Sequence, residues 1–371
     1  MTLDLLPEPL RSIFAFIIVL GVLVFIHELG HYLAARWRGV HVEVFSIGFG
    51  KRIRAWTDRH GTEWRLSWLP LGGFVKLHGQ EGPEDAAPEV RARWRPGQTF
   101  HDKPVRDRAI VVAAGPLANF LLAAVLFGGL YMTVGQPQPT TSIGTVVEGS
   151  AAQRAGLLPG DRLLSLDGAP ITRFEEVQRH ILPRAGQPVV IRLQRDGTEQ
   201  EVTATPDARE AGATTTGVLG IAGGAVEFQR LNPLSALAAG TAQTWDVTVQ
   251  TLAGLWQMIA GERGTEELGG PLRIAQISGQ VAQLGVASLV SFMAILSVNL
   301  ALINLFPIPV LDGGHLLFYA AEAIRGRPLP PRAIEYGFRA GFALLIALFV
   351  FATWNDLSSL GVVRWVSGFA G

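Results

Sequence analysis

The sequence His27-Glu28-Leu29-Gly30-His31 lies within an apolar run that extends from Ile13 to Ala35. On a helix, residues four apart return to nearly the same face, so the two imidazoles can bind one metal ion. Glu28 flanks the same face and can address a water molecule on that ion. Ionisable side chains inside a membrane span cost several kcal/mol, which makes a functional role the default. The alternative is a set of polar side chains that only packs against neighbouring helices.

Four apolar stretches approach the roughly 20 residues that a helix needs to cross a bilayer, at 13–35, 109–133, 288–308 and 334–354. The composition agrees, because 17% of the residues are charged, against roughly 25% in soluble domains. A cleaved signal peptide is the alternative for the first stretch, but its apolar run continues past the histidines without a small-x-small cleavage site. We therefore expect an α-helical membrane protein with four transmembrane helices.

The charge balance and the absence of cysteine restrict the chemistry. The 31 basic and 31 acidic residues cancel, so no net charge attracts nucleic acid. The chain has no cysteine, which excludes disulfides, thiolate ligands and a cysteine nucleophile. Any metal site must therefore use His, Asp and Glu side chains.

The basic residues predict the orientation in the membrane. All three lysines and eleven arginines fall between Arg36 and Arg108, which makes this loop cytoplasmic by the positive-inside rule. The region 134–287 is then extracytoplasmic, and the turn that carries Arg325, Arg327 and Arg332 is cytoplasmic. We expect the metal site to lie toward the cytoplasmic side of the membrane.

A third metal ligand is expected after the third apolar stretch, in the sequence NLFPIPVLDGG at 304–314. Pro307 and Pro309 cannot continue a helix, so this span must break near its cytoplasmic end. Such a break is tolerated in a membrane only against protein or a wet cavity. Asp312 is the favoured ligand, and His315 is the alternative.

Two further segments need a place. The loop 36–108 opens and closes with β-favouring runs that contain glycines, among them Gly72 and Gly73, and should form hairpins or a small sheet. The stretch 234–260 is nearly apolar enough to be a fifth span, but polar residues interrupt it. We expect an amphipathic helix on the outer membrane surface there.

Residues 142–208 alternate strand-like runs with two short helical patterns. The sequence SAAQRAGLLPGDRLLSLDG at 150–168 resembles a PDZ domain of the bacterial, circularly permuted kind. This resemblance implies a groove for an extended peptide between the strand near 143–147 and the helix that begins at Phe174. A soluble cap without a ligand is the alternative.

The pairing of HELGH with NLFPIPVLDG resembles the intramembrane site-2 metalloproteases, and more closely their bacterial regulator-of-sigma-E branch. Four other segments carry the same resemblance: FSIGFGKRI at 45–53, LPLGGFVKLHG at 69–79, GPLANF at 115–120 and GGPLRIAQ at 269–276. The branch often has two PDZ domains in tandem, whereas one is present here.

The resemblance implies a role for each matching residue. His27, His31 and Asp312 would bind Zn²⁺, and Glu28 would be the general base. Asn304 would bind the substrate backbone or stabilise the oxyanion, and Asn119 would position the substrate strand. Gly72 and Gly73 would allow a substrate strand to approach the loop edge, although they can equally be turn residues.

We therefore expect a zinc-dependent endopeptidase of the bacterial inner membrane that cuts transmembrane segments, such as those of anti-sigma factors or signal-peptide remnants. Membrane lipid and an upstream site-1 protease are the other expected partners. A divalent-metal transporter would also place His and Asp in its spans, but it explains neither Glu28 nor the PDZ-like segment. A non-catalytic PDZ scaffold is the third possibility. The expected boundaries are 1–35 (first helix), 36–108 (cytoplasmic loop), 109–133 (second helix), 142–224 (PDZ-like domain), 232–287 (amphipathic region), 288–333 (third helix and turn) and 334–371 (fourth helix and tail).

Overall fold

A computed structural model describes residues 7–82, 86–138, 140–211, 214–224, 227–264 and 269–359. The chain forms two compact units, one comprising Met1–Leu130 with Asn232–Gly371 and the other comprising Tyr131–Leu231. The second unit is therefore a continuous insertion into the first. The predicted tail after residue 359 lies outside the described residues.

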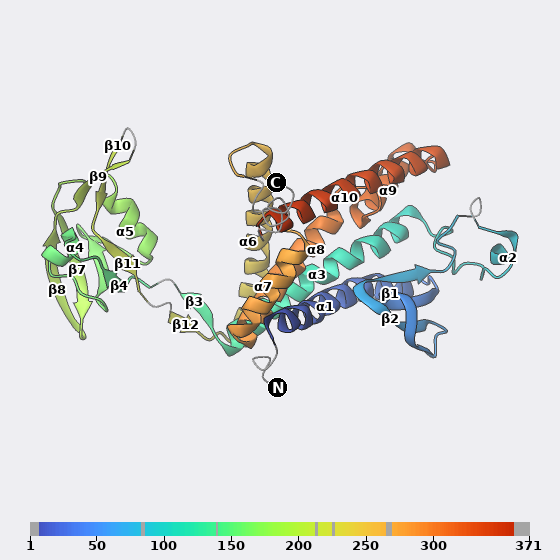
Figure 1. The fold of residues 1–371 in the computed structure, drawn as a ribbon, viewed down its shortest axis with the longest axis horizontal. Helices are drawn as coiled ribbons and strands as arrows, with labels where there is room; N and C mark the ends of the chain where they lie inside the picture. The colour runs from blue at the N-terminus through green and yellow to red at the C-terminus, as the bar shows by residue number, and fades with distance from the viewer. Residues whose placement is uncertain are drawn as a thin grey trace, which may run out of the picture. The chain divides into compact units, whose positions relative to one another are not determined.

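Four helices are long and apolar enough to cross a membrane, as predicted: α1 (Glu8–Trp37), α3 (Val105–Thr133), α8 (Val286–Leu305) and α10 (Pro331–Ser359) (Figure 1). Each covers its predicted stretch except at the end of the third. There α8 ends at Leu305, three residues before the predicted limit, and the chain turns away through Pro307 and Pro309. Proline lacks the N–H and clashes with the preceding turn, so the helix stops before these two residues.

The other helices of this unit are α2 (Pro88–Arg91), α6 (Pro233–Ile259), α7 (Pro271–Gln283) and α9 (Asp312–Arg325). The start of α7 is capped from another helix. Asp356 of α10 is buried and accepts hydrogen bonds from the backbone N–H groups of Gly270, Leu272 and Arg273 at 2.8, 3.0 and 3.1 Å. These N–H groups have no partner within their own helix, so Asp356 satisfies them and fixes α7 to α10.

Helix α6 confirms the predicted helix at 234–260 but has an unexpected inner face. Its buried side contains Gly240, Thr244 and Thr248, and the two threonines donate to carbonyls one turn earlier. Gly240 approaches the backbone of α3 so closely that a Cβ would meet Gly128, and small residues of this kind permit close helix packing. Trp245 and Trp256 are 67% and 69% exposed. Because α6 packs along α3 and points apolar side chains outward, this packing does not support the predicted position flat on the membrane surface.

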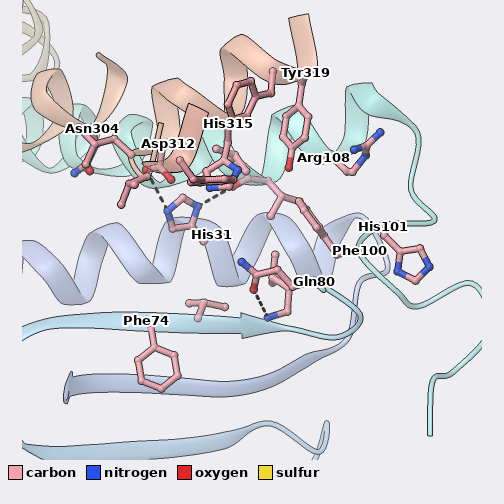
Figure 2. A pocket seen from close by; sticks show the side chains of 18 of the residues that line it. His31, Phe74, Gln80, Phe100, His101, Arg108, Asn304, Asp312, His315 and Tyr319 are labelled. Carbon is pink, nitrogen blue, oxygen red and sulfur yellow. Dashed lines mark hydrogen bonds and ion pairs between the residues drawn. The ribbon is translucent and has the colours of Figure 1, made fainter. Parts of the chain in front are cut away.

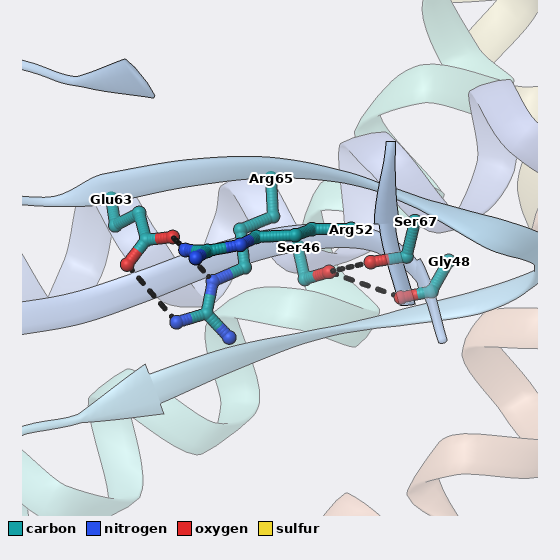
Figure 3. A network of polar contacts seen from close by, with 6 residues as sticks. All are labelled: Ser46, Gly48, Arg52, Glu63, Arg65 and Ser67. Atoms are coloured by element: carbon teal, nitrogen blue, oxygen red, sulfur yellow. Dashed lines mark hydrogen bonds and ion pairs between the residues drawn. The ribbon is translucent and has the colours of Figure 1, made fainter. Parts of the chain in front are cut away.

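The predicted β-rich loop contains two long strands, β1 (Val42–Thr57) and β2 (Glu63–Leu77). Residues 44–47 of β1 have partners on both sides, because they pair with 73–76 and also with 63–66 of β2. Among the described strands, the segment 73–77 pairs with β1 alone, so it forms an edge of this sheet. Figure 3 shows the buried hydroxyl of Ser46, which donates to Gly48 O at 3.0 Å and contacts Ser67 Oγ at 3.3 Å across the sheet.

The sheet is fixed to the end of α1 by aromatic packing and by one carboxylate. Phe45 is buried against Phe25, Tyr32 and Trp64. Burial raises the pKa of Asp58, but hydrogen bonds from Trp64, from the backbone of Thr62 and His60, and from the Tyr32 hydroxyl outweigh it and lower the pKa to about 2. Asp58 is thus ionised at neutral pH and connects the β1–β2 turn to α1.

The inserted unit contains the strands and helices that the sequence predicts for residues 142–208. Its four-stranded antiparallel sheet has the order β6-β5-β7-β8, and a further pair joins β11 to β4. Its core consists of small and branched apolar residues, among them Leu163, Leu166, Ile191 and Leu193. The elements are β4 (Ile143–Val146), α4 (Ala151–Arg154), β5 (Arg162–Leu166), β6 (Ala169–Pro170), α5 (Phe174–Ile181), β7 (Val189–Arg195), β8 (Thr198–Ala204), β9 (Asp207–Ala211), β10 (Thr214–Val218) and β11 (Ile221–Gly223).

The unit is longer than the predicted 142–224 because a short ribbon joins its two ends. Strand β3 (Gln136–Gln138) pairs antiparallel with β12 (Glu227–Gln229). The backbone N–H of Leu231 also donates to Tyr131 O at 3.0 Å. The chain therefore enters and leaves the insertion through neighbouring strands. Such short strands have little hydrophobic pattern, so the sequence did not predict them.

Candidate active site

The three predicted metal ligands meet in space. His27 and His31 come from α1, and Asp312 is the first residue of α9. Their ligand atoms all lie within 4.8 Å of one another. Asp312 Oδ2 lies 3.2 Å from His27 Nε2 and 3.5 Å from His31 Nε2, and the two Nε2 atoms are 3.2 Å apart. Figure 2 shows His31 and Asp312 facing each other across the site.

These distances fit zinc. Bonds of about 2.0–2.1 Å at tetrahedral angles put neighbouring ligand atoms about 3.3–3.4 Å apart, close to the three distances observed here. Asp312 Oδ2 is also buried, and its polar neighbours are the same two Nε2 atoms that would bind the cation with it. Two imidazoles and one carboxylate leave a fourth position open, which is the pattern of a catalytic zinc site rather than a structural one.

Two glycines allow α1 and α3 to approach at the site, and neither was among the predicted site residues. A Cβ on Gly30 would lie 2.8 Å from the carbonyl carbon of Ala114. A Cβ on Gly115 would lie 2.5 Å from Cε1 of His31. The close approach lets His31 Nδ1 hydrogen-bond with Val111 O at 2.9 Å, so Nε2 faces the metal position. The sequence GPLANF contains Gly115, but it does not specify which helix this glycine will contact.

The break after α8 places Asp312. Gly313 and Gly314 pack directly against the carbonyls of residues 305, 306 and 308, where a Cβ would overlap the backbone. Val310 has a φ of 99°, an unusual value for a β-branched residue and one that is typical of functional sites. Asp312 then starts α9 beside the histidines.

Glu28 points from the metal ligands toward the sheet. It lines the same cavity as His27 and His31, and the backbone of Val75 hydrogen-bonds to its carboxylate. Gly73 allows this contact, because a Cβ there would lie 3.2 Å from Glu28 Cγ and 2.7 Å from Ser46 O. Gly72 has a φ of +104°, and a Cβ there would meet the Phe49 ring. Gly73 thus brings the sheet edge to Glu28, whereas Gly72 turns the chain.

The remaining predicted residues have different positions. Asn304 lines the cavity and donates from Nδ2 to Leu300 O at 3.0 Å. His315 lines it too, but its ring lies against Phe338 at 5.2 Å and it is not part of the metal-ligand group found in the described residues. Asn119 is fully buried beside His27 and is not among the cavity-lining residues. Its position therefore gives no support to the predicted contact with substrate.

The cavity at the metal site has a volume of about 670 Å³. Away from the metal ligands it is lined by Gln80, His101 and Arg108 (Figure 2). Glu322 also lines it and forms an ion pair with Arg108, in which the closest atoms are 2.6 Å apart. This volume is within the range of about 300–1,000 Å³ that is common for ligand sites. It can take several residues of an extended peptide beside Glu28.

Comparisons with known proteins agree with this geometry. The family model described as Peptidase family M50 matches residues 15–348. A relative in Rhizobium meliloti, named as a zinc metalloprotease, is 43% identical over 363 residues, which cover 93% of this chain and 96% of the relative. The regulator of sigma-E protease RseP of Salmonella typhimurium is 31% identical over 452 aligned positions, which cover 95% of this chain and 99% of RseP. Among solved structures, the PDZ domain of an SdrC-like protein from Listeria monocytogenes matches 23% of this chain and 84% of that domain, at 19% identity and a TM-score of 0.18.

Proposed function

Because this chain belongs to peptidase family M50, we propose that it is a zinc metalloprotease that hydrolyses peptide bonds within the transmembrane segments of other proteins. The observation that carries the proposal is the convergence of His27, His31 and Asp312 beside Glu28, between helices long and apolar enough to cross a membrane. Placing ionisable ligands between membrane-spanning helices is costly, and cleavage of a soluble substrate would not require it.

Each residue near the metal position has a distinct task. When bound, zinc polarises the peptide carbonyl and lowers the pKa of a water molecule toward 7. The Glu28 carboxylate takes the proton from the attacking water and delivers it to the leaving amine. Asn304 Nδ2 donates one hydrogen bond to Leu300 O. We assign its second N–H to a hydrogen bond with the developing oxyanion. His315 is assigned no role as a ligand.

The substrate is expected to unwind and add as a strand to the sheet edge at 73–77. Peptide groups in a helix are hydrogen-bonded and shielded, so a protease must first extend them. The N–H groups of Val75 and Leu77 hydrogen-bond with the Glu28 carboxylate and with Gln80 Oε1, the latter at 3.4 Å. They are therefore donors on the open side of the edge strand, where a substrate carbonyl can replace a side-chain acceptor.

The orientation and the partners are part of the proposal. The basic loop 36–108 supports a cytoplasmic position for the metal site and an extracytoplasmic position for the inserted PDZ-like unit, in the inner membrane. The match with RseP supports membrane-protein substrates such as anti-sigma factors. An upstream site-1 protease that makes the first cut is a further proposed partner. Signal-peptide remnants are the second substrate class. No specific observation favours a metal transporter or a non-catalytic scaffold.

The test compares the wild type with Glu28→Gln, both purified in detergent with a transmembrane model substrate. The glutamine variant should bind one zinc ion and lose cleavage, because the ligands remain while the base is lost. Glu335→Gln is the matched control, because Glu335 is exposed, pairs with Arg339 and is not among the residues that line the cavity. Near wild-type cleavage by Glu28→Gln would exclude Glu28 as the base, and absence of zinc from the wild type would exclude the proposed function.

A further inference from the structure

Asn119 lies in α3 directly behind a metal ligand. Its side chain is 0% exposed, and its Nδ2 lies 3.3 Å from His27 Nδ1. The hydroxyl of Ser297 donates to the Asn119 backbone carbonyl at 2.8 Å, which fixes this part of α3 to α8. Within the described part of the chain, Asn119 Oδ1 is buried and has no hydrogen-bond partner. The polar contact of this side chain is therefore with His27.

The chemistry of His27 decides which atom of the Asn119 amide should face its ring. Its Nε2 faces His31 Nε2 and Asp312 Oδ2 and is therefore the atom on the metal side. A neutral imidazole that binds a metal through Nε2 carries its hydrogen on Nδ1 and needs an acceptor there. A rotation of the Asn119 amide by 180° exchanges Oδ1 and Nδ2 and moves no other atom. Oδ1 then accepts from His27 Nδ1, and Nδ2 takes the position that Oδ1 had.

The second histidine has the same arrangement. His31 Nδ1 lies 2.9 Å from Val111 O, a backbone carbonyl of α3, the helix that also contains Asn119. Val111 and Asn119 are two turns apart on α3, and His27 and His31 are one turn apart on α1. Helix α3 therefore presents one acceptor to the rear nitrogen of each imidazole, while both front nitrogens meet Asp312.

We propose that Asn119 is a positioning residue whose Oδ1 holds His27 in the tautomer and ring orientation that direct Nε2 to zinc. The inference rests on the proposed function of the site, and it replaces the predicted contact of Asn119 with substrate. The backbone carbonyl of Val111 does the same for His31 and cannot be removed by substitution. Asn119 is therefore the residue through which this support can be tested.

The experiment measures zinc affinity by chelator competition on the purified full chain, separately from cleavage. Asn119→Leu keeps a similar shape but has no acceptor, and we expect its zinc affinity to fall 10–100-fold. Asn119→Asp keeps an acceptor oxygen and should bind zinc within about threefold of the wild type. Ser297→Ala is the matched control, because it removes a hydrogen bond of the Asn119 backbone and leaves the amide in place. If Asn119→Leu does not fold, Asn119→Ala takes its place against Asn119→Asp.

Three results would overturn the inference. One is wild-type zinc affinity in the leucine or alanine variant, and another is equal loss in the aspartate variant. The third is a raised KM for the substrate with unchanged zinc affinity, which would assign Asn119 to substrate binding instead. The proposed function fails differently: a wild-type chain that binds zinc but never cuts a transmembrane substrate would refute proteolysis and leave the zinc-affinity comparison intact.

Discussion

The substitution Gly115→Ala tests whether the metal site depends on the close approach of α1 and α3. A Cβ at residue 115 would lie 2.5 Å from Cε1 and 2.9 Å from Cδ2 of His31, and closer still to Nε2, the ligand atom. Ordinary van der Waals contact begins at about 3.4 Å, so the ring or the helix must shift by at least about 0.9 Å.

That shift is large for a metal site. Zinc–ligand distances are held within about 0.2 Å, and a displacement of about 1 Å costs on the order of 100-fold in a positioned reaction. Movement of α3 away from α1 gives no relief, because it also withdraws Val111 O from His31 Nδ1. We therefore expect Gly115→Ala to weaken zinc binding by about 100-fold or more and to abolish cleavage.

The assay is chelator competition for zinc, followed by cleavage of a transmembrane substrate at saturating zinc. Gly129→Ala is the matched control, because Gly129 is in the same helix and a Cβ there would meet no atom within 4 Å. The control should keep wild-type zinc affinity. Wild-type affinity in Gly115→Ala, with both variants folded, would refute the packing argument.

Three other predictions follow from the same features. Asp312→Ala should lose zinc and activity whereas His315→Ala should keep zinc, and full zinc occupancy in the Asp312 variant would require a different third ligand. A reporter fused within 80–95 should read cytoplasmic and one in the turn at 195–200 extracytoplasmic, and the reverse pattern would contradict the assignment of the catalytic side. Replacement of residues 140–224 by a short flexible linker should leave zinc binding and cleavage of already trimmed substrates intact and should permit some cleavage of untrimmed ones. Loss of trimmed-substrate cleavage in a stable, zinc-loaded deletion would make the inserted unit a required docking site.

The sequence predicted the parts of the site that depend on local order. His27 and His31 are four residues apart on one helix, so their common face follows from helix geometry. Pro307 and Pro309 end α8 by local sterics, which predicted a break although not its first residue. The four spans were predictable for a similar reason, because an apolar run of about 20 residues by itself indicates a membrane-spanning helix.

The features that the sequence did not predict depend on which segments meet. Gly30 and Gly115 matter because they lie where α1 contacts α3 beside the metal ligands. No local sequence pattern specifies which helix α1 will contact. The position of Asn119 behind His27 has the same origin, since the two residues are 92 positions apart. Helix periodicity does not say which face of α6 is covered, so the polar residues in 234–260 predict an exposed face, whereas Thr244 and Thr248 face inward.

The β3–β12 ribbon makes the inserted unit exchangeable. Its two strands return the chain to the place where it left, so the spacing between α3 and α6 is independent of what lies between them. Domains of different size, or more than one, can then occupy this position without any change in the helices that hold the metal ligands. The alignment with RseP spans 452 positions for a chain of 371 residues, so the two chains differ in length. Substrate access can therefore change in evolution by replacement of the inserted unit, while the helices that hold the metal ligands stay the same.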